Sequence, residues 1–207
     1  GTKLVADPSG LYDRDVADEF PGKSPVDPEV PTLDPKLFRK LDTRVALIKD
    51  HAKPFGLVNP IQWRAVSNPD PKRFQRAYEA TSQVLDRPIA EILGHPAGDP
   101  SWSKDEWEHY TSGPEDPRYA ALLKEIAAHY PDAPQNEPLI KALMVKLWLE
   151  ENGVYSLNSN HEGSADPTAD FLFGDRTGYC VYFAHAAAYL YRTAGMPARV
   201  GSGYAVE

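Results

Sequence analysis

The sequence has a single cysteine among its 207 residues, which excludes a disulfide within the chain and a metal site built from several thiolates. It also lacks an apolar run of the roughly 18 residues that would span a bilayer, and it begins without a charged-then-apolar secretion signal. Because residue 1 is glycine rather than methionine, we expect the sequence to be a trimmed part of a longer protein. These absences therefore leave the cellular compartment open.

Positive charge is scarce as well. The chain carries 22 lysines and arginines against 30 aspartates and glutamates, a net charge of −8, so nucleic acid is not an expected partner. The sequence shows no glycine-rich phosphate loop and no spaced cluster of metal ligands, and we expect neither a cofactor nor a metal. With 42% apolar and 25% charged residues, the composition is that of a globular protein with a sizeable core.

The first two parts of the chain contain no pattern that we can connect to chemistry. Residues 1–33 are rich in proline, which removes amide donors and favours extended backbone, so we predict an extended arm. Residues 34–115 predict a mainly helical N-terminal region, with helices starting at Asp34-Pro35 and near Pro71 and a capping box at Ser103. The expected apolar stripes of the first two helices are Leu37, Phe38, Leu41, Val45 and Ile48, and Phe74, Ala77, Tyr78 and Leu85.

The third part, residues 116–207, starts with two further helical patterns. Asp116-Pro117 opens a helix that ends before residue 131, and a second helix occupies residues 136–153, with Gly153 as a left-handed terminal residue. Residues 154–157 read as a short strand. Loop-like sequence then continues as far as residue 178.

The only cysteine, Cys180, lies where the pattern changes from loop to helix. The predicted helix runs to about residue 194, and its first-turn amides favour a thiolate. Gly195 and Pro197 end it, and residues 198–204 read as a strand that returns beside it. Free cysteines often only fill space in a core, and the spacing alone favours that interpretation of Cys180.

The segment GYCVYFAHAAAYLYRTAGMPARVGSGY, residues 178–204, resembles the core of the transglutaminase-like superfamily. The matching positions are Gly178, Cys180, Phe183, Ala184, Arg192, Gly195, Pro197, Arg199, Val200, Gly203 and Tyr204. Residues 154–157 and the stretch DFLF at 170–173 resemble the bacterial branch of this superfamily. The resemblance extends over about residues 116–207 and makes Cys180 the expected nucleophile.

The resemblance implies an α+β fold with a papain/transglutaminase-like core, in which the nucleophile helix packs on an antiparallel sheet. It implies a thiol enzyme, a peptidase, amidase or acyltransferase, that forms a thioacyl intermediate on a protein or peptide substrate and passes it to water or an amine. The amide of Cys180, with Tyr155 as a weaker side-chain candidate, would stabilise the oxyanion. It also implies a periplasmic or other extracytoplasmic location, with a membrane tether in the full-length protein.

The histidine and aspartate of the family lie tens of residues beyond the nucleophile, whereas this sequence ends at Glu207. Five helical steps rotate His185 about 140° away from the face of Cys180, so we expect it to pack or to hydrogen-bond. His161 lies in a loop, where histidines are usually solvated, and is a weak candidate for the base. Structural roles are expected for the remaining polar residues of this part: Asp166, Asp170, Asp175, Arg192 and Arg199.

We therefore expect a core truncated after its first strands, and an inactive fragment of an active enzyme. A missing C-terminal segment or another chain would complete the sheet. The alternative is a noncatalytic protein-interaction module that retains the fold.

Overall fold

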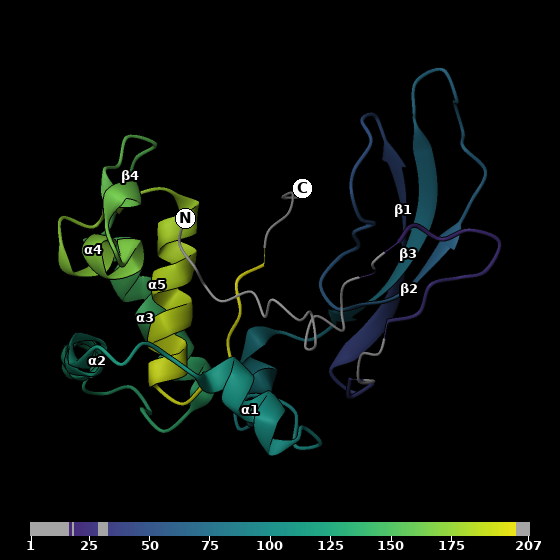
Figure 1. Cartoon of the computed structure of the whole chain (residues 1–207). Helices are drawn as coiled ribbons and strands as arrows, with labels where there is room; N and C mark the ends of the chain where they lie inside the picture. Colours follow the sequence, from purple (N-terminus) through teal and green to yellow (C-terminus); the bar gives the residue numbers. More distant parts are fainter. Residues whose placement is uncertain (1–16, 18, 29–32, 202–207) are drawn as a thin grey trace. The chain divides into compact units, whose positions relative to one another are not determined.

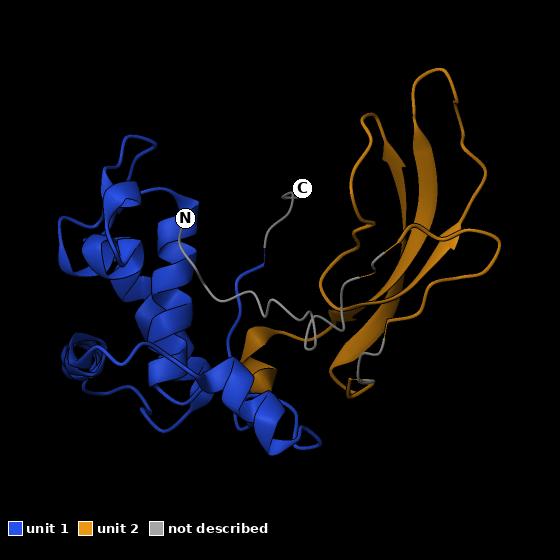
Figure 2. Ribbon diagram, viewed as in Figure 1, with its two compact units in different colours: residues 1–5, 93–207 blue, residues 6–92 orange. Residues whose placement is uncertain are grey.

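The computed structural model describes residues 17, 19–28 and 33–201 (Figure 1). The described residues fall into two compact units, which divide between Ile92 and Leu93 (Figure 2). One unit contains an antiparallel sheet and the other consists mainly of helices. The boundary predicted near residue 115 is therefore displaced, because the structure assigns residues 93–115 to the helical unit.

The sheet unit contains strands β1 (Phe38–Leu47), β2 (Pro60–Ala65) and β3 (Arg76–Leu85), followed by the short 3-10 helix η1 (Ile89–Ile92). The strands are antiparallel in the order β1-β3-β2, so β3 lies in the middle. The buried side chains on the sheet include Trp63 and Tyr78, which are almost fully enclosed. Of the predicted extended arm, residues 17, 19–28 and 33 are described, and a bridge from Val26 to Trp63 places residues 19–28 beside β2.

The prediction of helices over residues 34–85 is wrong. Asp34 and Asp70 do bind the following backbone amides, as helix caps would, but each opens a single turn that leads into a strand. In β1 the less exposed side chains alternate, with Leu41, Val45 and Leu47 on the same face. Positions 41 and 45 are four apart, a spacing that fits both a helix face and a strand face, and this ambiguity produced the error.

The helical unit contains five α-helices and one pair of short strands among the described residues. The helices are α1 (Lys104–Thr111), α2 (Pro117–His129), α3 (Pro138–Asn152), α4 (Pro167–Phe173) and α5 (Cys180–Thr193). The strands are β4 (Val154–Tyr155) and β5 (Thr177–Gly178), and η2 (His161–Gly163) is a 3-10 turn. Helix α5 contacts the other four helices and is the centre of this unit (Figure 1).

The predictions for α1, α2, α3 and α5 are confirmed in position. Ser103 and Glu106 form the capping box of α1, and Asp116 caps α2 by accepting a hydrogen bond from the amide of Arg118. Gly195 has a φ of 77°, which is the expected left-handed residue after α5. Gly153 has a φ of −100°, so the left-handed end predicted for α3 is wrong.

The sheet predicted beside the nucleophile helix differs from the observed arrangement. Within residues 93–201, the strand pair is β4–β5, and it is parallel. Residues 198–201 form no strand, and the rest of the predicted strand at 198–204 lies outside the described residues. The DFLF residues were expected in a loop, but they fall within helix α4. No helix in the described ranges is long and apolar enough to cross a membrane.

Candidate active site

Cys180 is the first residue of α5, and it is exposed. The preceding residue, Tyr179, provides no side-chain hydrogen bond to the first turn of the helix. The first amides of a helix have no carbonyl partner within the helix and carry the positive end of its dipole, so they stabilise an anion at this position. The interpretation of Cys180 as a buried packing residue is therefore wrong.

The backbone just before Cys180 is held tightly. Gly178 is buried, and a side chain at this position would meet the rings of Tyr182 and Phe171 at 2.8 and 3.1 Å. The carbonyl of Gly178 also accepts a hydrogen bond of 2.8 Å from the amide of Ser156, which follows β4. These aromatic rings and the neighbouring strand fix the path of the backbone that leads into Cys180.

Tyr155 is brought to this end of the unit by the strand pairing. It lies opposite Gly178 in the parallel register of β4 and β5, and its ring stacks on Phe183 at a centroid distance of 6.4 Å. Tyr155 is 65% exposed. The pairing thus places Tyr155 opposite a residue that lies two positions before Cys180. Its role as an oxyanion donor stays a prediction.

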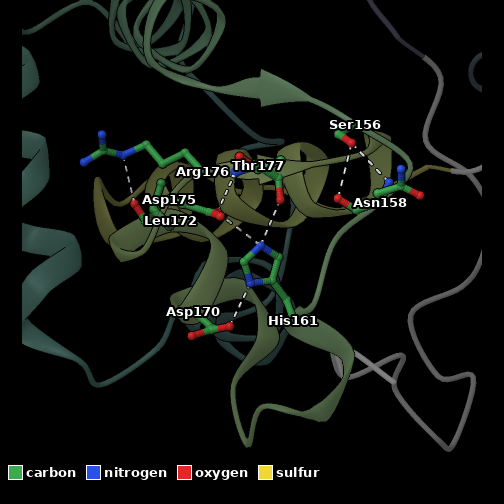
Figure 3. Close-up of polar contacts among 8 residues, drawn as sticks. All are labelled: Ser156, Asn158, His161, Asp170, Leu172, Asp175, Arg176 and Thr177. Carbon is green, nitrogen blue, oxygen red and sulfur yellow. Dashed lines mark hydrogen bonds and ion pairs between the residues drawn. The ribbon is translucent and has the colours of Figure 1, made fainter.

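His161 is buried rather than solvated, so the sequence-based expectation for its environment is wrong. Its Nδ1 lies 2.7 Å from Oδ2 of Asp170, and its Nε2 lies 2.9 Å from the carbonyl oxygen of Thr177 (Figure 3). A carboxylate and a carbonyl only accept hydrogen bonds, so both ring nitrogens act as donors. His161 therefore has no lone pair with which to accept a proton from Cys180.

The charge state of His161 agrees with this geometry. Burial alone would lower its pKa, but the hydrogen bonds to Asp170 and to the carbonyl of Thr177, with the charges of Asp170 and Asp175, outweigh burial. The net result is a pKa raised above the usual value for histidine. The carboxylate of Asp175 lies 3.7 Å from Nε2 and contributes to this balance.

The acidic residues near the site have structural contacts, as predicted. Asp166 caps α4 by accepting a hydrogen bond from the amide of Ala169, and Asp175 accepts one from the amide of Thr177. The neighbouring Arg176 makes different contacts. The guanidinium of Arg176 instead donates to the carbonyl of Leu172 and lies over the ring of Trp148.

His185 and Arg192 also have structural roles. The buried His185 donates from Nδ1 to the carbonyl oxygen of Val181, one turn earlier in α5, at 2.6 Å. Arg192 donates to the carbonyl oxygens of Ser112 and Ala198. It therefore connects the end of α5 to the residue that follows α1 and to the segment that follows α5. Arg199 is exposed and forms contacts of its own. In the described part of the chain, no three His, Cys, Asp or Glu side chains are grouped as a metal site.

The part of the chain that carries this site is similar in sequence to a known protein family. Residues 125–207 match the model of the Transglutaminase-like superfamily. Over these residues the chain is similar to that superfamily. A protein-glutamine gamma-glutamyltransferase of Pseudomonas aeruginosa is 39% identical to the chain over 88 residues, which make up 42% of the chain. The chain spans only 12% of the length of this curated relative.

Two solved structures also resemble the chain that contains this transglutaminase-like segment. The periplasmic domain of TgpA from Pseudomonas aeruginosa, bound to ethylmercury, is 26% identical with a TM-score of 0.38, covering 60% of this chain and 41% of that one. A candidate cysteine protease from Cytophaga hutchinsonii is 17% identical with a TM-score of 0.39, covering 81% of this chain and 57% of that one.

Proposed function

We propose that the chain is the nucleophile-bearing part of a transglutaminase-like thiol enzyme that forms a thioacyl intermediate at Cys180. The observation that carries this proposal is the exposed position of the only cysteine at the first residue of α5, within the segment that matches the superfamily. The name of the Pseudomonas relative supports a glutamine side chain as acyl donor, and the family supports peptide amides as well.

The chemistry follows from the position of the thiol. The Cys180 thiolate attacks an amide carbonyl, and the resulting oxyanion is stabilised by the amide of Cys180, with Tyr155 as the side-chain candidate. Collapse of this intermediate breaks the carbon–nitrogen bond, and the amine leaves after it gains a proton. Water then releases an acid, or a second amine forms a new amide.

In this proposal, neither of the two histidines near Cys180 is the group that takes the thiol proton and returns it to the leaving amine. His161 donates from both of its ring nitrogens, and His185 is bonded to its own helix. We propose that a histidine and an acid from a segment outside the described residues, or from another chain, complete the site. By family resemblance alone, we also propose a periplasmic or membrane-tethered parent.

The test is to extend the chain with the residues that follow position 207 in its gene and to assay the product. With a glutamine peptide and a primary amine, we expect thiol-dependent ammonia release, through hydrolysis or amine incorporation. Cys180→Ala should lower this activity by roughly 10³-fold or more, since nothing else in the chain replaces the nucleophile. His129→Gln, a change at an exposed helix end, is the matched control and should retain the activity.

The 207-residue chain alone is expected to be inactive in the same assay. An extended protein that folds but shows neither hydrolysis nor transfer on glutamine or peptide amides would contradict the proposal. That result would favour the noncatalytic interaction module instead.

A further inference from the structure

The cluster around His161 joins three segments that are separate in the sequence. The histidine lies in η2, Asp170 lies in α4 and Thr177 begins β5 (Figure 3). The ring also contacts the ring of Phe171 in α4 and that of Tyr182 in α5, at centroid distances of 5.8 and 5.1 Å. A single imidazole therefore contacts the elements that come directly before and after the nucleophile.

The bridge requires a doubly protonated ring. Neither the Asp170 carboxylate nor the Thr177 carbonyl can donate, so each hydrogen bond uses one of the two N–H groups of an imidazolium. A neutral ring has only one N–H and would lose one of the two bonds. Because the ring is buried, the ring nitrogen that loses its proton would then lack a partner, which is costly.

The bond to Thr177 acts directly on the backbone that leads to Cys180. Only Gly178 and Tyr179 separate Thr177 from the nucleophile. Strand β5 pairs with β4 through two residues on each strand, so this pairing alone is a short anchor. The imidazolium adds a second connection, which joins β5 to α4. Helix α4 in turn packs against α5 through more extensive contacts.

We propose that His161 is a positioning residue for Cys180, which as an imidazolium clamps β5 to α4 and thereby holds the thiol at the tip of α5. This inference rests on the proposed function for its significance in catalysis, but the clamp itself can be tested without a substrate. The charged and titratable groups that face the ring are Asp170 from α4, Asp175 from the turn before β5 and the phenol of Tyr182 from α5.

The clamp makes the presentation of Cys180 dependent on pH. At low pH the ring carries both protons and holds both acceptors. As the pH rises through the titration of His161, one donor is lost, and β5 is no longer held firmly before the first turn of α5. The reactivity of Cys180 should therefore fall over the pH range in which His161 loses its proton.

Alkylation of the 207-residue chain by iodoacetamide tests this, because Cys180 is its only thiol. We expect His161→Gln to slow labelling at about pH 6 by roughly 2- to 10-fold, the range expected when a thiolate loses support from a helix N-terminus. The pH profile of the unmodified chain should show the titration of two groups, and that of His161→Gln should show one. His129→Gln removes a different histidine of the same unit and should keep the two-group profile.

Asp170→Asn gives a second route if His161→Gln fails to fold. The Asp170 side chain is half exposed, so the fold should tolerate the change, while loss of the carboxylate makes the ring less basic. The histidine step in the labelling profile should then move to lower pH. The clamp would be overturned if the pH profile of labelling for Asp170→Asn, and for His161→Gln if it folds, superimposed on that of the unmodified chain.

Nitrogen NMR of the ring provides an independent readout. Both ring nitrogens of His161 should be protonated at about pH 6, and a single neutral tautomer in the folded chain would overturn the proposal. These outcomes are separate from the enzyme assay. An inactive extended protein with an intact two-group labelling profile would refute the function and leave the clamp standing.

Discussion

At the scale of single residues, the proposed chemistry depends on one exposed thiol that directly follows a closely packed segment of backbone. Cys180 is open to solvent, whereas Gly178, two residues earlier, is buried against two aromatic rings. Glycine is required there because no other residue lacks the Cβ that would collide with Tyr182 and Phe171. The proposed nucleophile therefore follows a backbone position that close packing holds in place.

Replacement of this glycine gives a direct test. In Gly178→Ala, the new methyl group would lie 2.8 Å from the ring of Tyr182, so we expect a loss of about 1–3 kcal/mol in the free energy of unfolding from overpacking. Chemical denaturation followed by circular dichroism measures this loss. Gly163→Ala is the matched control, because a methyl group there meets no atom within 4 Å, and its effect should stay within about 0.5 kcal/mol. Equal effects of the two changes would contradict the packing argument.

His161 predicts how the stability of the helical unit changes with pH. The pKa of this histidine is raised in the folded chain by its hydrogen bonds and neighbouring charges, which overcome the opposing effect of burial. Such a group contributes stability that is fully present below its unfolded pKa of about 6.5 and is lost as the pH rises through the folded pKa. Urea unfolding of the unmodified chain should show this decline above about pH 6.5, and His161→Gln should lack it. A decline of equal size in both proteins would assign it to other groups.

At the scale of helices and strands, the same sequence signal leads to two different structures. Among the Asp-Pro pairs of the sequence, those at residues 34, 70, 116 and 166 each contain an aspartate that accepts a hydrogen bond from a following amide. The pairs at 116 and 166 open helices, whereas those at 34 and 70 open one turn before a strand. Local capping was therefore predictable, but the length of the helix that follows it was not.

The reason lies in contacts between distant residues. Helices α2, α3 and α5 were predictable because their apolar stripes are local and continue over three turns or more. Strand β3 is stabilised by partners on both sides, β1 and β2, that are far away in the sequence. Its buried Tyr78, Ala80 and Ser82 alternate along one face, but a small and a polar residue conceal the period of two.

The capping box of α1 is a prediction that the structure confirms and that mutation can quantify. Ser103→Ala removes the oxygen that accepts the amide of Glu106, so we expect a loss of about 1 kcal/mol in the free energy of unfolding. Ser103→Thr retains a hydroxyl at this position and should cost much less. Thermal unfolding of both variants measures the difference. Identical melting temperatures for the two would mean that the cap contributes nothing.

At the scale of the whole molecule, the position of Cys180 at the start of a helix could be predicted from the sequence, but its surroundings could not. Cys180 was located by a local helix start and by family resemblance. The burial of His161 depends on Asp170 and Thr177, nine and sixteen residues away in segments with no periodic pattern that connects them. The closest signal in the sequence was the cluster of acids before the cysteine, which was correctly expected to be structural.

The division into two units predicts two separable unfolding transitions. Trp63 is buried in the sheet unit, so Trp63→Ala should lower the stability of that transition by about 3–5 kcal/mol and leave the transition of the helical unit unchanged. Differential scanning calorimetry measures both transitions. Ile48→Ala, at a position that is 63% exposed in the same unit, is the control with an effect within about 0.5 kcal/mol. A single transition that shifts as a whole would contradict independent units.

The pairing of β4 with β5 has a consequence for the order of folding. Helices α3 and α5 are stabilised by local hydrogen bonds and can begin to form early, but β4 and β5 meet only after the intervening chain has closed into a loop. We therefore expect the nucleophile to be presented late, after the helices have collapsed. In a newly synthesised chain, the Cys180 thiol would therefore reach its final position only when β4 and β5 have paired.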